Sequence, residues 1–184
     1  MTHYGANEIA ASFRTVRNNT IQVAEDIPED RYDFQAAQGV RTVRQMLIHI
    51  SMTHNFPLML HRDRPEMKSL EGLNLLPLIE TVMAAEKEPR TKARILQDLR
   101  DGGNEFENWV KTLSDDFLGE VITMPGGTPP SRSRFDMLIA VKEHEMHHRG
   151  QLMLIERMLG ITPHLTRNQQ ARMEALRASQ AAKT

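Results

Sequence analysis

The chain contains no cysteine among its 184 residues. This absence excludes disulfides, thiolate metal ligands, iron–sulfur clusters and a cysteine nucleophile. The chain also lacks an excess of positive charge, since 23 Lys and Arg stand against 24 Asp and Glu, for a net charge of −1. Because nucleic-acid binding needs clustered, unbalanced Lys and Arg, we expect no nucleic-acid partner.

Long apolar runs are missing as well. No uninterrupted run approaches the roughly 18 residues that a membrane span requires. The first residues, MTHYGANEIAAS, have neither the basic region nor the apolar region of a secretory signal peptide. We therefore expect a cytoplasmic protein without a membrane partner. A composition with 40% hydrophobic and 26% charged residues is ordinary for a globular chain of one domain.

Helical periodicity dominates the rest of the sequence. Apolar residues recur at helical spacing over about 5–26, 42–60, from 91 to 113, and 133–159. The second segment opens with a capping box, Thr42 and Gln45, and carries Pro57 in its last turn, where we expect a kink. Residues 73–86 predict a weaker helix interrupted by Pro77. We find no convincing strand, so the pattern predicts an all-α, four-helix bundle with one or two additional short helices.

The domain boundary follows from the same pattern. Residues 1–165 read as a single bundle domain, and residues 166–184 as a peripheral C-terminal helix or tail, because they contain good helix formers but a poor apolar stripe. The pair Gly102 and Gly103 falls inside a predicted helix. It indicates either local weakening or the close approach of a neighbouring element.

Three histidines fall within five residues of the last core helix. His144 and His148 lie four residues apart, so both imidazoles project from one helix face and can reach one divalent ion, whereas His147 points to the flank. The alternative is a pair of core histidines bonded to carbonyl groups or to each other. A metal site needs at least one more ligand, and His49, on a buried face of the second helix, is the best candidate. The other histidines are His3, His54, His61 and His164, and we expect most of them to be ordinary surface residues.

Two segments carry a family resemblance. YDFQAAQGVRTVRQMLIHI, residues 32–50, and HEMHHRGQLMLIERMLGITP, residues 144–163, closely resemble the DinB-like family of metal-binding helical bundles. The resemblance implies a four-helix bundle of DinB-like topology with a three-histidine metal site at His49, His144 and His148. It also implies a divalent ion, often nickel or zinc, and a homodimer. Some relatives are S-transferases or isomerases that use low-molecular-weight thiols.

These observations predict a metal-dependent enzyme acting on a small molecule, of the thiol S-transferase or hydrolase type, with metal-bound water at the three-histidine site. Three imidazoles suit Zn, Ni, Co or Fe, and sulfur chemistry would need an external low-molecular-weight thiol. A non-catalytic metal-binding or stress-response dimer, with a structural metal, is the alternative. The substrate itself is not indicated by any motif.

The residues around the histidines allow a third interpretation. His144, Glu145 and His148 also match the H-E-x-x-H pattern of zinc peptidases, in which Glu145 would be the general base. The longer form of that pattern fails, because Gln151 and Leu154 occupy its glycine and third-histidine positions. Glu145 therefore stays a candidate catalytic base and, alternatively, a solvated carboxylate or one that orients an imidazole. Gln151 is a candidate for contacting a cofactor or substrate.

Overall fold

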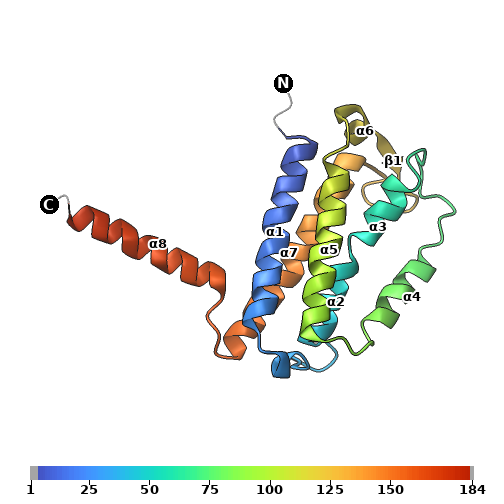
Figure 1. Cartoon of the computed structure of the whole chain (residues 1–184). Coiled ribbons are helices and arrows are strands. Elements are labelled where there is room, and N and C mark those ends of the chain that lie inside the picture. Colours follow the sequence, from blue (N-terminus) through green and yellow to red (C-terminus); the bar gives the residue numbers. More distant parts are fainter. Residues whose placement is uncertain (1–3, 183–184) are drawn as a thin grey trace.

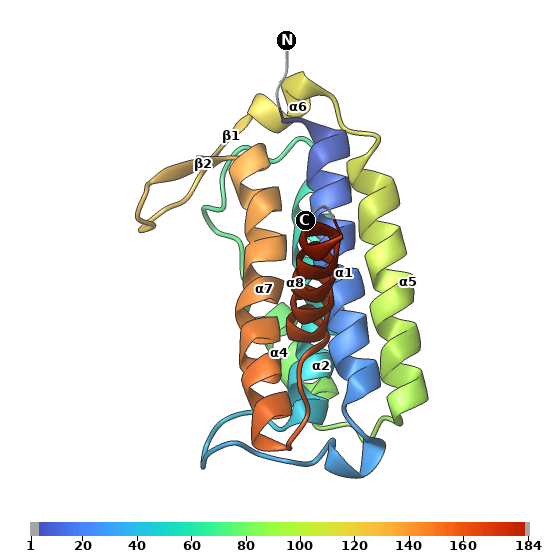
Figure 2. The same cartoon turned by 90° about the vertical axis from the view of Figure 1, so that its left-hand side faces the viewer.

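The core of the protein is a bundle of four helices. The structure is a computed structural model that describes residues 4–182. Its principal helices are α1 (Ala6–Asp26), α2 (Val43–Met52), α5 (Lys92–Val110) and α7 (Arg134–Met158). Helices α1 and α2 each pack against both α5 and α7 (Figure 1, Figure 2). The predicted all-α four-helix bundle is confirmed.

The apolar stripes read from the sequence form the interior. On α1, Ile9, Phe13 and Val23 are at most 1% exposed, and Phe13 meets Phe106 of α5 in an edge-on ring contact. Each such side chain contributes about 1.5–3 kcal/mol when it is fully removed from water. The bundle is therefore held mainly by the burial of these periodic stripes.

Helix α2 begins where the sequence indicates and ends earlier than expected. The Thr42 hydroxyl accepts from the Gln45 backbone N–H, and the Gln45 side chain accepts from the Thr42 N–H, as in a capping box. The helix then breaks at Thr53 and continues as α3 (Asn55–Pro57) and a π-helical turn, η2 (Leu58–Arg62). Pro57 cannot donate to the carbonyl four residues earlier, so the break falls at Thr53 rather than at the proline.

Helix α4 (Leu76–Ala85) lies beside α2 at the edge of the bundle (Figure 1). We expected Pro77 to interrupt this segment, and that expectation is wrong. Pro77 occupies the first turn, where its missing N–H has no intrahelical partner to lose. Only Ala85 of this helix is buried, so α4 covers the bundle and contributes a single residue to its core.

Short elements occupy the segments between the main helices. Two strands, β1 (Val121–Thr123) and β2 (Ser131–Ser133), pair antiparallel, with Ile122 opposite Arg132. A 3-10 turn, η1 (Glu29–Arg31), and a short helix, α6 (Asp115–Gly119), complete the chain order up to α7. The prediction that strands are absent was wrong, because three-residue strands are too short to show a two-residue alternation.

The last helix, α8 (His164–Ala181), projects away from the bundle (Figure 1, Figure 2). His164 is buried at its start, and Arg167 binds Asp26 of α1 through a charge-assisted bond of 2.6 Å, while every residue from Arg167 to Ala182 is exposed. His3 and the last two residues of the predicted tail lie outside the described residues. Among the residues described, no helix is both long and apolar enough to cross a membrane.

The paired glycines of α5 permit close contacts with two neighbours. A Cβ atom at Gly102 would lie 2.1 Å from the His54 ring, and one at Gly103 would lie 2.9 Å from the Arg17 side chain. Of the two interpretations of this pair, the close approach of neighbouring elements is the one the structure bears out. The helix runs unbroken through both positions.

Candidate metal centre

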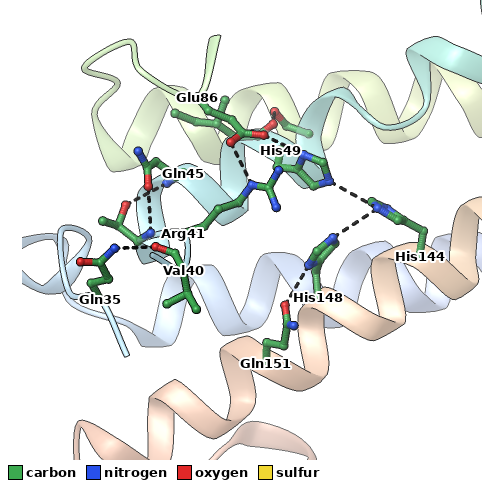
Figure 3. Close-up of polar contacts among 12 residues, drawn as sticks. Gln35, Val40, Arg41, Gln45, His49, Glu86, His144, His148 and Gln151 are labelled. Atoms are coloured by element: carbon green, nitrogen blue, oxygen red, sulfur yellow. Dashed lines mark hydrogen bonds and ion pairs between the residues drawn. The ribbon is translucent and has the colours of Figure 1, made fainter. Parts of the chain in front are cut away.

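The three histidines singled out in the sequence come together between α2 and α7. His49, His144 and His148 each offer one ring nitrogen, and these atoms all lie within 4.8 Å of one another. The His144 Nε2 atom lies 3.3 Å from Nε2 of His49 and 3.2 Å from Nε2 of His148 (Figure 3). His147, on the same turn of α7, is exposed and outside this cluster, as its angular position predicted.

The partners of the other ring nitrogens fix the tautomers. Nδ1 of His49 lies 2.8 Å from a Glu86 carboxylate oxygen, and Nδ1 of His148 lies 2.9 Å from the side-chain amide oxygen of Gln151. Both oxygens accept, so each Nδ1 carries the proton and each Nε2 presents a lone pair. A proton on the His144 Nε2 atom could be donated to the Nε2 atom of His49 or of His148, but not to both. A cation at this point satisfies all three nitrogens at once, so the donor set fits a divalent metal.

Burial keeps the three imidazoles in the neutral form that a metal requires. Burial lowers the pKa of His144 to about 4, with smaller contributions from His148 and His49. Burial also lowers the pKa of His49 and of His148 below the ordinary value for histidine. His144 is the most exposed of the three, so the cluster stays open on its side.

Polar contacts connect His49 to Glu86, at the end of α4, and through Glu86 to Arg41. Glu86 caps the C-terminal end of α4 and accepts from His49 with one oxygen and from the Arg41 Nε atom, at 2.8 Å, with the other (Figure 3). Such a carboxylate orients the ring and increases its basicity as a ligand. The sequence analysis missed Glu86, because it lies 37 positions from His49 and follows a helix with no polar motif.

The cluster lies at one end of a cavity of about 450 Å³. Helices α2, α4 and α7, together with the turns after α2, supply its walls. The lining is mostly apolar and includes Met52, Phe56, Leu75, Leu78, Ile79, Val82, Met83, Met124, Met137 and Val141, with His49 and His144 at the cluster. A cavity of this size and character is typical of sites for small organic molecules.

Glu145 lies away from the cluster. Its side chain is fully buried, and both carboxylate oxygens accept from the Arg17 Nε atom, at 3.0 and 3.1 Å. The expectation of a solvated carboxylate is therefore wrong, because the side of α7 that carries Glu145 packs onto α1. The assignment of Glu145 as a catalytic base stays a prediction, and this geometry does not favour it. Gln151 is exposed and orients His148.

Three other histidines are buried rather than exposed as expected. His54, His61 and His164 are 5%, 1% and 6% exposed. His54 is enclosed because Gly102 leaves room for its ring, and His164 because its Nε2 atom pairs with Asn19 of α1. His61 lines the cavity and contacts Arg134 of α7. Helical angle alone could not place His54 and His61, since the predicted helix that carries them breaks at Thr53.

The fold and the cluster define a helical bundle with a three-histidine site between two of its helices. The sequence profile of the DinB superfamily matches residues 12–152. The chain therefore belongs to the DinB superfamily. A comparison with curated protein sequences finds no match.

Two solved structures share this fold. YfiT from Bacillus subtilis, described as a probable metal-dependent hydrolase with an unusual four-helix bundle topology, aligns with a TM-score of 0.69 at 16% identity. That alignment covers 88% of this chain and 91% of YfiT. The DinB-like protein YjoA from Bacillus subtilis aligns with a TM-score of 0.61 at 20% identity, covering 84% of this chain and 93% of YjoA.

Proposed function

We propose that this protein is a divalent-metal-dependent enzyme that acts on a small organic molecule. The observation that carries the proposal is the convergence of three imidazole Nε2 atoms at one end of an apolar cavity of about 450 Å³. Hydrolysis is the first candidate reaction, supported by the similarity in fold to YfiT and its description as a probable metal-dependent hydrolase. Three nitrogen ligands suit Zn, Ni, Co or Fe.

Each group has a distinct part in this proposal. When bound, the metal supplies Lewis acidity and lowers the pKa of a coordinated water or thiol. Glu86 and Gln151 hold His49 and His148 in the tautomer that presents Nε2. The apolar walls bind the organic part of the substrate, exclude water and place the reacting group beside the cluster.

Transfer of a thiol is the second candidate reaction. The chain has no cysteine, so the sulfur would come from an external low-molecular-weight thiol. The open side of the cluster at His144 gives room for such a co-substrate next to the cavity. The peptidase interpretation has less support, since the carboxylate it needs, Glu145, is bound to Arg17.

The first test is the metal content of purified, untagged protein and its variants. We expect about one ion per chain in the wild type and loss of that ion in His49→Ala, His144→Ala and His148→Ala, with helical circular dichroism retained. His147→Ala is the matched control, because this histidine shares the turn of α7 but lies outside the cluster. Failure to take up Zn, Ni, Co, Fe or Mn would contradict the proposal.

The second test separates the reaction types. The metal-loaded protein is assayed against ester, amide and lactone panels, and then with small electrophiles in the presence of low-molecular-weight thiols. We expect turnover in one panel that disappears on chelation and returns with the metal. A metal that leaves only when the protein unfolds, with no turnover in either panel, would instead favour the non-catalytic structural role.

We also propose that the protein forms a homodimer through α8. Beyond its first turn this helix has only exposed residues, including Met173 and Leu176, although most of the stability of helices in proteins comes from packing of an apolar face. Packing against a second copy would cover it. We expect sedimentation to report a dimer that a chain ending at Thr162 does not form, whereas a monomer at every concentration would contradict the proposal.

A further inference from the structure

We infer that the cavity takes an elongated ligand whose far end carries an oxygen acceptor, and that the Nε2–H group of His61 binds this oxygen. This inference rests on the proposed function, because it places the other end of the ligand at the three-histidine cluster. It assigns to His61 a role in substrate recognition. The ligand class is an apolar chain or ring system with an oxygen acceptor, such as a carboxylate, opposite its reacting group.

The cavity runs lengthwise between two antiparallel stretches of chain. One stretch carries His49 and, after the break at Thr53, His61, while the other is α7, on which Arg134 contacts His61 and His144 contacts His49. Arg134 and His144 are ten residues apart on one α-helix, which is about 15 Å. Both His61 and His144 line the cavity, so it extends along most of this length.

The tautomer of His61 follows from its buried partner. Arg134 is fully buried, and its Nη1 atom lies 2.9 Å from Nδ1 of His61. A guanidinium group only donates, so Nδ1 of His61 must accept and its Nε2 atom must carry the proton. The other Arg134 nitrogens donate to Glu120, at 2.8 Å, and to the carbonyls of Pro65 and Met67. This network fixes the ring in position.

The Nε2–H donor of His61 has no hydrogen-bond partner among the described residues. His61 is 1% exposed, and the other side chains that line the cavity are mostly apolar, with Arg41 and Arg132 as its cationic residues. An unpaired buried donor costs about 1–3 kcal/mol, so such donors are rare unless a ligand or an ordered water completes them. Burial, together with Arg134, lowers the pKa of His61 to about 4, so the ring is neutral at physiological pH.

Two probes of equal chain length test the inference on zinc-loaded protein by calorimetry. Decanohydroxamate ends in a methyl group, and the monohydroxamate of sebacic acid ends in a carboxylate, while the hydroxamate of each binds the metal. His61→Asn keeps an oxygen that accepts from Arg134 but removes the donor at the Nε2 position. We expect it to weaken the carboxylate probe about tenfold or more and to leave the methyl probe unchanged.

Two further variants separate recognition from structure. His61→Gln restores a donor near the Nε2 position and is expected to recover part of the affinity for the carboxylate probe. His54→Asn is the matched control, because His54 is also buried, has a ring nitrogen without a partner in the described part of the chain, and does not line the cavity. We expect this variant to change neither affinity.

The outcomes are distinct for the two proposals. Equal effects of His61→Asn on both probes, or no effect on either, would overturn the role of His61 and leave the metal-dependent function standing. Absence of bound metal, or hydroxamate binding that His144→Ala does not abolish, would overturn the proposed function and this inference together.

Discussion

Helix α7 buries two carboxylates in contrasting surroundings. Glu145 and Glu156 are both fully buried, three turns apart on the same helix. Glu145 is bound by Arg17, whose guanidinium also donates to the carbonyl of Leu99 at 2.7 Å. Neither carboxylate oxygen of Glu156 has a hydrogen-bond partner among the described residues. Burial by itself therefore does not describe the surroundings of a carboxylate, because among the described residues only one of these two is bonded to a cation.

The charges near Glu156 explain its different behaviour. Burial, and next the proximity of Asp26, raise the pKa of Glu156 to about 7, and Arg167 and Arg157 offset only part of this. Arg167 is already bound to Asp26. The carboxyl group thus exchanges its proton near neutrality at the junction of α1, α7 and α8.

The largest expected effect comes from breaking the Glu145 pair. Arg17→Met leaves a buried carboxylate without its cation, and we expect a loss of about 3–5 kcal/mol in the free energy of unfolding, measured by urea denaturation. The double variant Arg17→Met with Glu145→Met removes both charges and should recover most of that loss. A single variant as stable as the wild type would show that the pair is not needed.

The same substitution at the two carboxylates should have opposite effects at alkaline pH. Because the folded state raises the pKa of Glu156, its contribution to stability is complete below the unfolded value of 4.5 and is lost as the pH rises through about 7. Glu156→Gln cannot ionise. Relative to the wild type, it should gain about 2–3 kcal/mol between pH 4.5 and pH 8 in denaturation experiments.

Glu145→Gln is the matched control for this measurement. It leaves Arg17 without its carboxylate, so we expect it to destabilise the protein at both pH values. A pH-independent difference between Glu156→Gln and the wild type would show that the carboxyl group titrates normally in the folded protein.

The smallest expected effect on stability tests the packing of Gly103 against Arg17, the cation of the buried ion pair. Gly103→Ala would place a Cβ atom 2.9 Å from the Arg17 side chain, and we expect it to cost about 1–2 kcal/mol. Gly150→Ala on α7 is the control, since among the described residues no other element lies within 4 Å of its added methyl group. Thermal unfolding should show a gain of about 0.5–1 kcal/mol for the control, and a similar gain at Gly103 would contradict the close packing.

Local patterns were sufficient to predict the bundle and the histidine cluster. Periodic stripes identified the main helices, and the capping box at Thr42 set the start of α2. Spacing of four residues placed His144 and His148 on one face, and the isolated polar ring of His49 in an apolar helix completed the set. These features depend on residues that are near one another in the sequence.

Contacts between distant segments could not be predicted in the same way. Glu86, Arg17 and Arg134 acquire their partners only when separate helices pack, and no periodicity encodes the choice. The cavity has the same origin, because the apolar stripe of α4, which includes Leu78, Ile79 and Val82, does not indicate which helices it will face. The short strands were missed because three residues are too few to define an alternation.

The carboxylate of Glu86, at the C-terminal end of α4, has two roles. Glu86 belongs to the wall of the cavity and also accepts the Nδ1 proton of His49. A molecule that shifts this wall must alter the hydrogen bond that tunes a metal-facing imidazole. If binding of such a molecule changes the affinity for the metal ion by some factor, then binding of the ion changes the affinity for the molecule by the same factor.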